Sequence, residues 1–199
     1  VRWSNRRFEP HLKDITMRFS RSSFIRVSVF AGLAAVVGVA LTGCAVSVPT
    51  GVRPVNGFDA KRYMGTWYEL ARIDNRFEKG LTKASAQYSL NTDGTVTVIN
   101  RGFDAAKNEW REVQGTARFL GEPDVAALKV SFFGPFYGGY NVVSLDDDYQ
   151  TALVVGGNSD YFWLLSRKKQ IPREELKALL DKAQGFGVDL SRVITVNQE

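Results

Sequence analysis

Cysteine and histidine are almost missing from this chain of 199 residues, which contains one of each. A lone cysteine, Cys44, cannot form an intramolecular disulfide. The sole histidine, His11, precedes the segments that we expect to fold. Ser-His-Asp and Cys-His catalysis, imidazole zinc sites and histidine-ligated haem therefore lack the side chains that they require. We expect no bound metal and no cofactor.

An excess of one charge sign is also missing once the N-terminal segment is set aside. The full sequence has 26 Lys and Arg residues against 21 Asp and Glu residues. Residues 1–43 hold seven of the basic and two of the acidic ones, which leaves 19 of each in residues 44–199. A neutral segment offers no clustered basic surface for nucleic acid. We therefore expect no nucleic-acid partner.

No apolar run is long enough to cross a membrane. The longest, residues 27–40, would span about 21 Å as a helix, against a hydrocarbon core about 30 Å thick. This length disfavours the alternative of a transmembrane helix followed by a buried Cys44 thiol. The run follows three arginines after Met17 and precedes Leu41-Thr42-Gly43-Cys44, an order typical of bacterial lipoprotein signals. Residues 1–43 are thus predicted to be a signal peptide, with residues 1–16 either part of it or an untranslated upstream extension.

Cys44 is predicted to carry the acyl chains of the mature lipoprotein, which would anchor it stably to a membrane. Residues 44–57, with Pro49, Gly51 and Pro54, have no periodic apolar pattern and are expected to be a lipidated N-terminus and tether. The folded domain is expected over residues 58–199. Its length suffices for one core without disulfide staples.

The domain reads as short segments rich in Val, Tyr, Phe and Thr, separated by turn residues. Eight strands are predicted, over residues 66–73, 83–91, 94–102, 111–120, 126–132, 139–146, 150–156 and 161–167. Pro172 opens a helix whose apolar residues recur at helical spacing, at Leu176, Leu179, Leu180 and Ala183. A short final strand is predicted over 193–196. An all-β fold with one helix follows, and the pattern alone allows a sandwich or a closed barrel.

Several motifs resemble those of the lipocalin family. Gly65-Thr66-Trp67-Tyr68 resembles its first signature, and residues 69–72, 76–81, 131–140 and 164–167 are similar to bacterial lipocalins. The resemblance implies an eight-stranded antiparallel up-and-down β-barrel, closed at one end, with the C-terminal α-helix packed outside. It also implies that Gly65, Trp67 and Arg167 close the barrel, with the guanidinium lying across the indole face.

The resemblance, together with the period of two along a strand, nominates the wall of a ligand cavity. The side chains expected to point inward are Glu69, Ala86, Tyr88, Val98, Asn100, Val113, Leu128, Val130, Phe132, Val142, Leu153, Val155, Tyr161 and Trp163. Most are apolar, which suits an acyl chain. The two polar exceptions, Glu69 and Asn100, either orient a ligand or satisfy each other inside the barrel.

The function that the resemblance implies is non-catalytic binding of fatty acids or lysophospholipids for storage, transport or membrane maintenance. In a sorting rule of enterobacterial type, an Asp after the lipidated cysteine favours the inner membrane, so Ala45 implies the outer membrane by resemblance to that rule. The domain is expected at the periplasmic face of that membrane. Exposed aromatics at Phe77 and residues 133–140 would meet either the membrane or a second copy in a homodimer. Two alternatives stay open: a lipid- or isoprenoid-modifying enzyme with Glu69 as general base, and a structural lipoprotein with an empty barrel.

Overall fold

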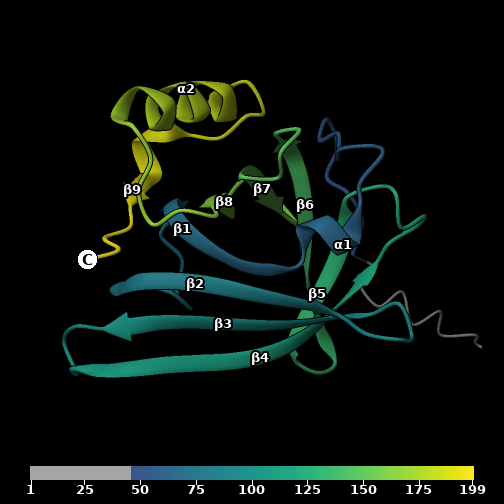
Figure 1. Ribbon diagram of the computed structural model, residues 1–199, viewed down its shortest axis with the longest axis horizontal. Coiled ribbons are helices and arrows are strands. Elements are labelled where there is room, and N and C mark those ends of the chain that lie inside the picture. The colour runs from purple at the N-terminus through teal and green to yellow at the C-terminus, as the bar shows by residue number, and fades with distance from the viewer. Residues whose placement is uncertain (1–45) are drawn as a thin grey trace, which may run out of the picture. The chain divides into compact units, whose positions relative to one another are not determined.

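The computed structural model describes residues 46–199, so Cys44 and the predicted signal peptide lie outside the described residues. Within residues 46–199, no helix combines the length and the apolar character that crossing a membrane would require. Figure 1 shows a strongly curved sheet with a single longer helix on its outside.

Eight antiparallel strands form a closed barrel (Figure 1). They are β1 (Gly65–Ile73), β2 (Leu81–Leu90), β3 (Val96–Asp104), β4 (Glu109–Phe119), β5 (Ala127–Phe133), β6 (Phe136–Leu145), β7 (Thr151–Gly156) and β8 (Phe162–Ser166). Each strand pairs with its sequence neighbour, and β1 pairs with both β2 and β8, which closes the barrel. The eight predicted segments each coincide with one of these strands, and the barrel is the architecture that the lipocalin resemblance implied.

Three shorter elements and one helix complete the fold. Helix α1 (Ala60–Tyr63) begins where the Asp59 carboxylate accepts hydrogen bonds from two backbone N–H groups. The C-terminal helix α2 (Arg173–Gln184) follows Pro172, as predicted. The 3-10 helix η1 (Leu190–Arg192) leads into β9 (Val193–Thr195), which pairs with β1 beyond the barrel strands.

A β-bulge in β1 decides which of its side chains reach the interior. The pairing of β1 with β8 shifts between Glu69 and Ala71, so that Leu70 and Ala71 both lie in the apolar cluster outside the barrel. Trp67 lies in the inner cluster, and Glu69 points inward as well. The extra residue returns Arg72 to the face of Glu69, whereas a regular strand would place residues three apart on opposite faces. The acidic and basic side chains therefore meet on the inner wall.

Helix α2 covers an apolar outer face of the barrel, as Figure 1 shows. Leu176, Leu179 and Leu180 pack against an outer cluster that the buried residue Ala183 joins. Leu153 and Val155 of β7 belong to this outer cluster, so the prediction that they face the cavity was wrong. Every residue of β7 is buried, and both of its faces carry apolar side chains. The sequence therefore shows no alternation of polar and apolar residues that would indicate which side chains point inward.

The segment after β9 fills a gap between β1 and β2. These strands pair only from Gly65 to Tyr68, and beyond that point their backbones separate. The side-chain amide of Gln198 donates to the carbonyl oxygens of Glu69 (2.7 Å) and Ala84 (2.8 Å), one on each strand. Gln198 thereby bridges the two strands where their own hydrogen bonds end.

Candidate functional site

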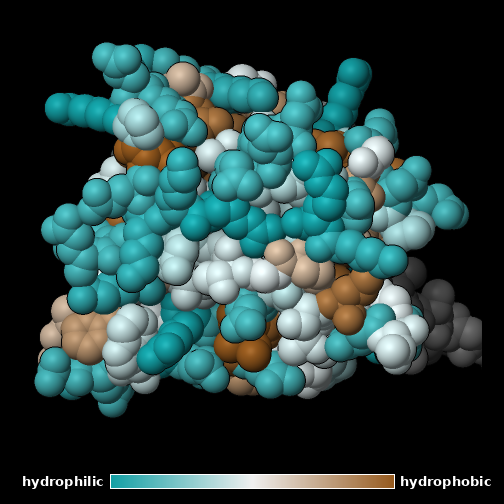
Figure 2. Space-filling model, viewed as in Figure 1, coloured by the Kyte–Doolittle hydropathy of each residue, from teal (hydrophilic) through white to brown (hydrophobic). Residues whose placement is uncertain are grey.

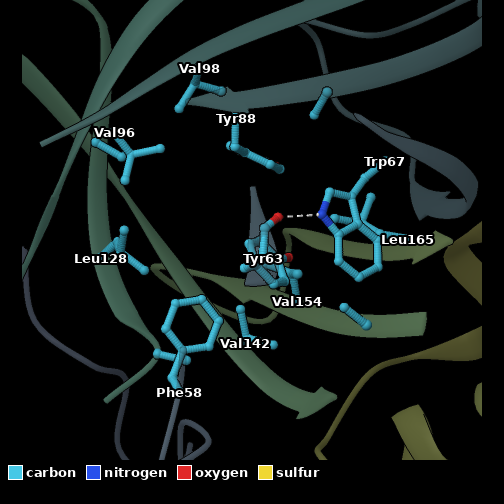
Figure 3. Packing of buried hydrophobic residues seen from close by; sticks show 14 of the residues in the cluster. Phe58, Tyr63, Trp67, Tyr88, Val96, Val98, Leu128, Val142, Val154 and Leu165 are labelled. Atoms are coloured by element: carbon cyan, nitrogen blue, oxygen red, sulfur yellow. Dashed lines mark hydrogen bonds between the residues drawn. The ribbon is translucent and has the colours of Figure 1, made fainter. Parts of the chain in front are cut away.

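One end of the barrel is closed by Trp67 and Arg167. Trp67 is fully buried, and its indole N–H donates to the backbone oxygen of Tyr63 (2.8 Å, dashed in Figure 3). The guanidinium carbon of Arg167 lies 4.0 Å from the centroid of the Trp67 ring, the stacking that the resemblance implied. Gly65 is at φ +94°, a conformation that favours glycine, and a Cβ there would lie 3.3 Å from Arg167.

Arg167 also donates hydrogen bonds to backbone carbonyls of three segments at the closed end. Its nitrogens donate to the carbonyl oxygens of Arg62, Tyr63, Met64, Thr66 and Tyr149 at 2.8–3.3 Å. Three of these oxygens belong to the C-terminal end of α1 and its cap residue, where regular helical hydrogen bonding stops. A guanidinium presents five N–H donors in a fixed plane, which suits it to this convergence.

An internal cavity lies above the closed end. The volume of the cavity is about 80 Å³, several times the ~10–15 Å³ that one water requires. Nine of the predicted wall residues line it: Glu69, Ala86, Tyr88, Val98, Asn100, Leu128, Val130, Phe132 and Trp163. Figure 3 shows Tyr88, Val98 and Leu128 directed toward this inner space. The lining is mostly apolar.

The other predicted wall residues lie elsewhere. Val142 is fully buried in the inner cluster but does not border the cavity. Val113 pairs with Asn100 on the inner face but lies beyond the cavity lining. Tyr161 stacks on Trp163 with ring centroids 6.2 Å apart and also stays outside the lining. Leu153 and Val155 face outward, as described above.

A polar cluster interrupts the apolar wall on the side away from Trp67. Arg72, 1% exposed, donates to the carboxylate of Glu69 (3.2 Å) and to the backbone oxygens of Glu78 (2.7 Å) and Leu81 (3.1 Å). The Glu78 carboxylate accepts from the indole N–H of Trp163 (3.0 Å) and from Asn75. Arg72 also donates to the carboxylate of Asp74 (3.3 Å), and both Glu69 and Glu78 line the cavity.

The charge state of Glu69 follows from this arrangement. Burial, reinforced by the neighbouring Glu78 carboxylate, raises the pKa of Glu69 well above its usual value, and Arg72 offsets this only in part. No hydrogen bond joins Glu69 to Asn100, and the buried Oδ1 of Asn100 has no hydrogen-bond partner among the described residues. The Glu78 carboxylate and the Asn100 oxygen therefore remain as acceptors beside the cavity.

A group of three tyrosines lies at the opposite, closed side of the cavity. The Tyr140 hydroxyl contacts those of Tyr63 (2.8 Å) and Tyr88 (2.9 Å), and all three residues line the cavity. Tyr140 was predicted to be an exposed rim residue; its position two residues before the inward-facing Val142 could have corrected this. Tyr63 comes from α1, and no sequence signal placed its side chain inside the barrel.

The rim at the other end carries exposed aromatics. Phe133 and Phe136 are 67% and 77% exposed, and Phe77 is 55% exposed. The face shown in Figure 2 is largely hydrophilic, with separate small apolar patches.

These features define a lipocalin: a closed eight-stranded barrel, an outer helix and a Trp–Arg pair at the closed end. A family model described as "Lipocalin-like domain" matches residues 58–198, and the chain belongs to this family. The fold also matches insecticyanin from the tobacco hornworm, at 20% identity and a TM-score of 0.59, over 76% of this chain and 86% of that one.

Several bacterial proteins are similar to this chain at higher identity. The Outer membrane lipoprotein Blc of Escherichia coli strain K12 is 54% identical over 150 residues, which cover 75% of this chain and 85% of that protein. The protein of the same name from Vibrio cholerae is 43% identical over 162 residues, which cover 81% and 94%. At this similarity the chain shares their location, as a lipid-anchored protein of the outer membrane.

Proposed function

We propose that this protein holds a single-chain lipid, a fatty acid or a lysophospholipid, in the barrel cavity for storage, transport or membrane maintenance. The observation that supports the proposal is the narrow apolar cavity, which ends in the tyrosine group and is interrupted by carboxylates on one side. Burial of an acyl chain there would contribute about 25 cal/mol per Å² of apolar surface.

The polar cluster favours the lysophospholipid of the two. Glu78 and the Asn100 oxygen leave acceptors toward the cavity, and Arg72 already donates to protein oxygens. A free carboxylate placed there would be repelled by Glu78. A glycerol hydroxyl would instead donate to these acceptors.

We also propose that Cys44 carries the lipid anchor and that residues 1–43 are removed as a signal peptide. Residues 46–57 then form a tether that is short and partly docked. Val55 donates to the carbonyl oxygen of Val142 (2.9 Å) and accepts from the N–H of Ala126 (2.9 Å), so residues from about 55 onward lie against the barrel. Because the residue after Cys44 is Ala45, the anchor would lie in the outer membrane and hold the domain at its periplasmic face.

We propose no catalytic role for Glu69. Its carboxylate is held by Arg72 and neighbours Glu78, so the geometry supports a structural role in the wall. Replacement of Glu69 by Gln should leave lipid binding intact, and loss of a lipid turnover activity in that variant would revive the enzymatic alternative.

Native mass spectrometry of residues 46–199, which contain every strand of the barrel, would test the proposal. We expect a co-purified single-chain lipid at one per protein, identified after extraction. Val130→Glu, which places a charge in the cavity wall, should abolish retention, whereas Lys129→Glu on the same strand should not. An empty protein that also fails to bind added lysophospholipid or fatty acid would refute the proposal and favour a structural lipoprotein.

A further inference from the structure

The three tyrosine hydroxyls at the closed side of the cavity form a chain of hydrogen bonds with Tyr140 in the middle. The contacts are 2.8 Å to Tyr63 and 2.9 Å to Tyr88. Tyr63 and Tyr88 are only 3% and 6% exposed. Tyr63 also packs on Trp67, with ring centroids 4.8 Å apart, which fixes the group at the closed end.

The three tyrosine hydroxyls have one more hydrogen-bond donor than the contacts within the group use. Three hydroxyls carry three O–H donors, but two oxygen–oxygen contacts use only two of them. The described residues supply no other acceptor to these hydroxyls. Burial raises the pKa of all three tyrosines, so none becomes a phenolate that could accept the third hydrogen. One O–H donor at the closed end therefore lacks a partner inside the protein.

A neutral oxygen, from a ligand or from water, suits this O–H donor better than an anion does. The nearest cation, Arg167, stacks on Trp67 and donates to five backbone carbonyls, so it is not available to a ligand anion. A carboxylate or phosphate buried beside a single O–H donor would lose far more hydration than it regained. The polar head of a lipid would stay nearer the open end, because the tyrosine group packs against Trp67 at the closed end.

We propose that the tyrosine group binds an oxygen atom at the far end of the acyl chain, so that the barrel selects single-chain lipids oxygenated at or near the methyl terminus. This inference rests on the proposed lipid-binding function. The ligand class is an acyl chain with a terminal hydroxyl or carbonyl, whose oxygen accepts the spare O–H. A terminal hydroxyl would in addition donate to a tyrosine oxygen.

The test compares 1-acylglycerols whose chains differ only in a terminal hydroxyl, at several chain lengths, by competition against a fluorescent fatty-acid probe on residues 46–199. We expect the hydroxylated lipid to bind about 3- to 10-fold more tightly at one chain length, where the hydroxyl reaches the tyrosines. In the triple variant Tyr63→Phe, Tyr88→Phe, Tyr140→Phe, the hydroxylated lipid should bind more weakly than the plain one. Tyr68→Phe, outside the cavity lining, should keep the wild-type preference.

The outcomes separate the two proposals. Equal affinity for plain and hydroxylated lipids at every chain length, with binding of both, would overturn the tyrosine inference and leave the lipid-binding function standing. Failure of every acylglycerol to bind would overturn both. If the triple variant does not fold, the chain-length dependence in the wild-type protein decides, because a hydroxyl effect that is uniform in length would place its contact outside the tyrosine group.

Discussion

Arg167 should contribute far more to the unfolding free energy of this barrel than a cation that only stacks on an exposed aromatic ring. Replacement by Met keeps an apolar stem over Trp67 but removes the guanidinium that binds five backbone carbonyls. The cation–π contact contributes about 0.5–2 kcal/mol. Stranding two or three partly buried carbonyl oxygens adds roughly 1 kcal/mol each. The variant should therefore lose about 3–5 kcal/mol of unfolding free energy.

A loss of this size is easily measured. With a urea m-value of about 1–3 kcal/mol per M, the midpoint should fall by one to several M, and Tm should fall by about 6–20 °C. Unfolding can be followed by the fluorescence of Trp67, Trp110 and Trp163 together. Arg192→Met is the matched control, because Arg192 makes one exposed ion pair with Asp160 and should lose no more than about 1 kcal/mol.

Arg167→Lys separates the two contributions. An ammonium can stack on the indole but cannot reach carbonyls arranged around a plane, so the Lys variant should recover less than half of the loss. A Lys variant as stable as the wild type would refute the claim that the carbonyl contacts carry the stability of the closed end. A Met variant no worse than the Arg192 control would refute the whole account.

Three further predictions concern the wall. Because the folded pKa of Glu69 is raised, this group binds more protons in the native than in the unfolded state above about pH 4, so its contribution to stability should fall as pH rises toward neutral; the difference in urea midpoint between the wild type and Glu69→Gln should change in this direction from pH 4 to 8, and a constant difference would contradict the raised pKa. Gln198→Ala should lose about 1–3 kcal/mol and speed amide exchange around Ala84, because two buried carbonyls lose their donor; unchanged exchange would contradict the bridging role. Leu153→Ala should lose about 2–5 kcal/mol while the folded fraction keeps its lipid affinity by titration, and weakened affinity would contradict the outward placement.

The eight strands could be predicted from the sequence because strands and turns are locally encoded, whereas the choice of a barrel over a sandwich came from the family resemblance. The Trp67–Arg167 pair was found through family resemblance, and the structure brings these residues together. Which side chains of β7 point inward could not be predicted, because both faces of this strand are apolar. Arg72 escaped detection because strict alternation places it outside, and only the bulge turns it inward. Glu78 lies on a loop, where no periodicity applies.

The bulge at Leu70 and Ala71 has a consequence for how such a chain can vary in length. With two consecutive residues outside, the loss of one of them would leave Glu69 and Arg72 still inside and Ile73 still outside. Elsewhere in a strand a one-residue deletion inverts every side chain beyond it. This point of β1 is therefore a place where an insertion or deletion is absorbed locally, and where related barrels can differ by one residue and still keep the same wall.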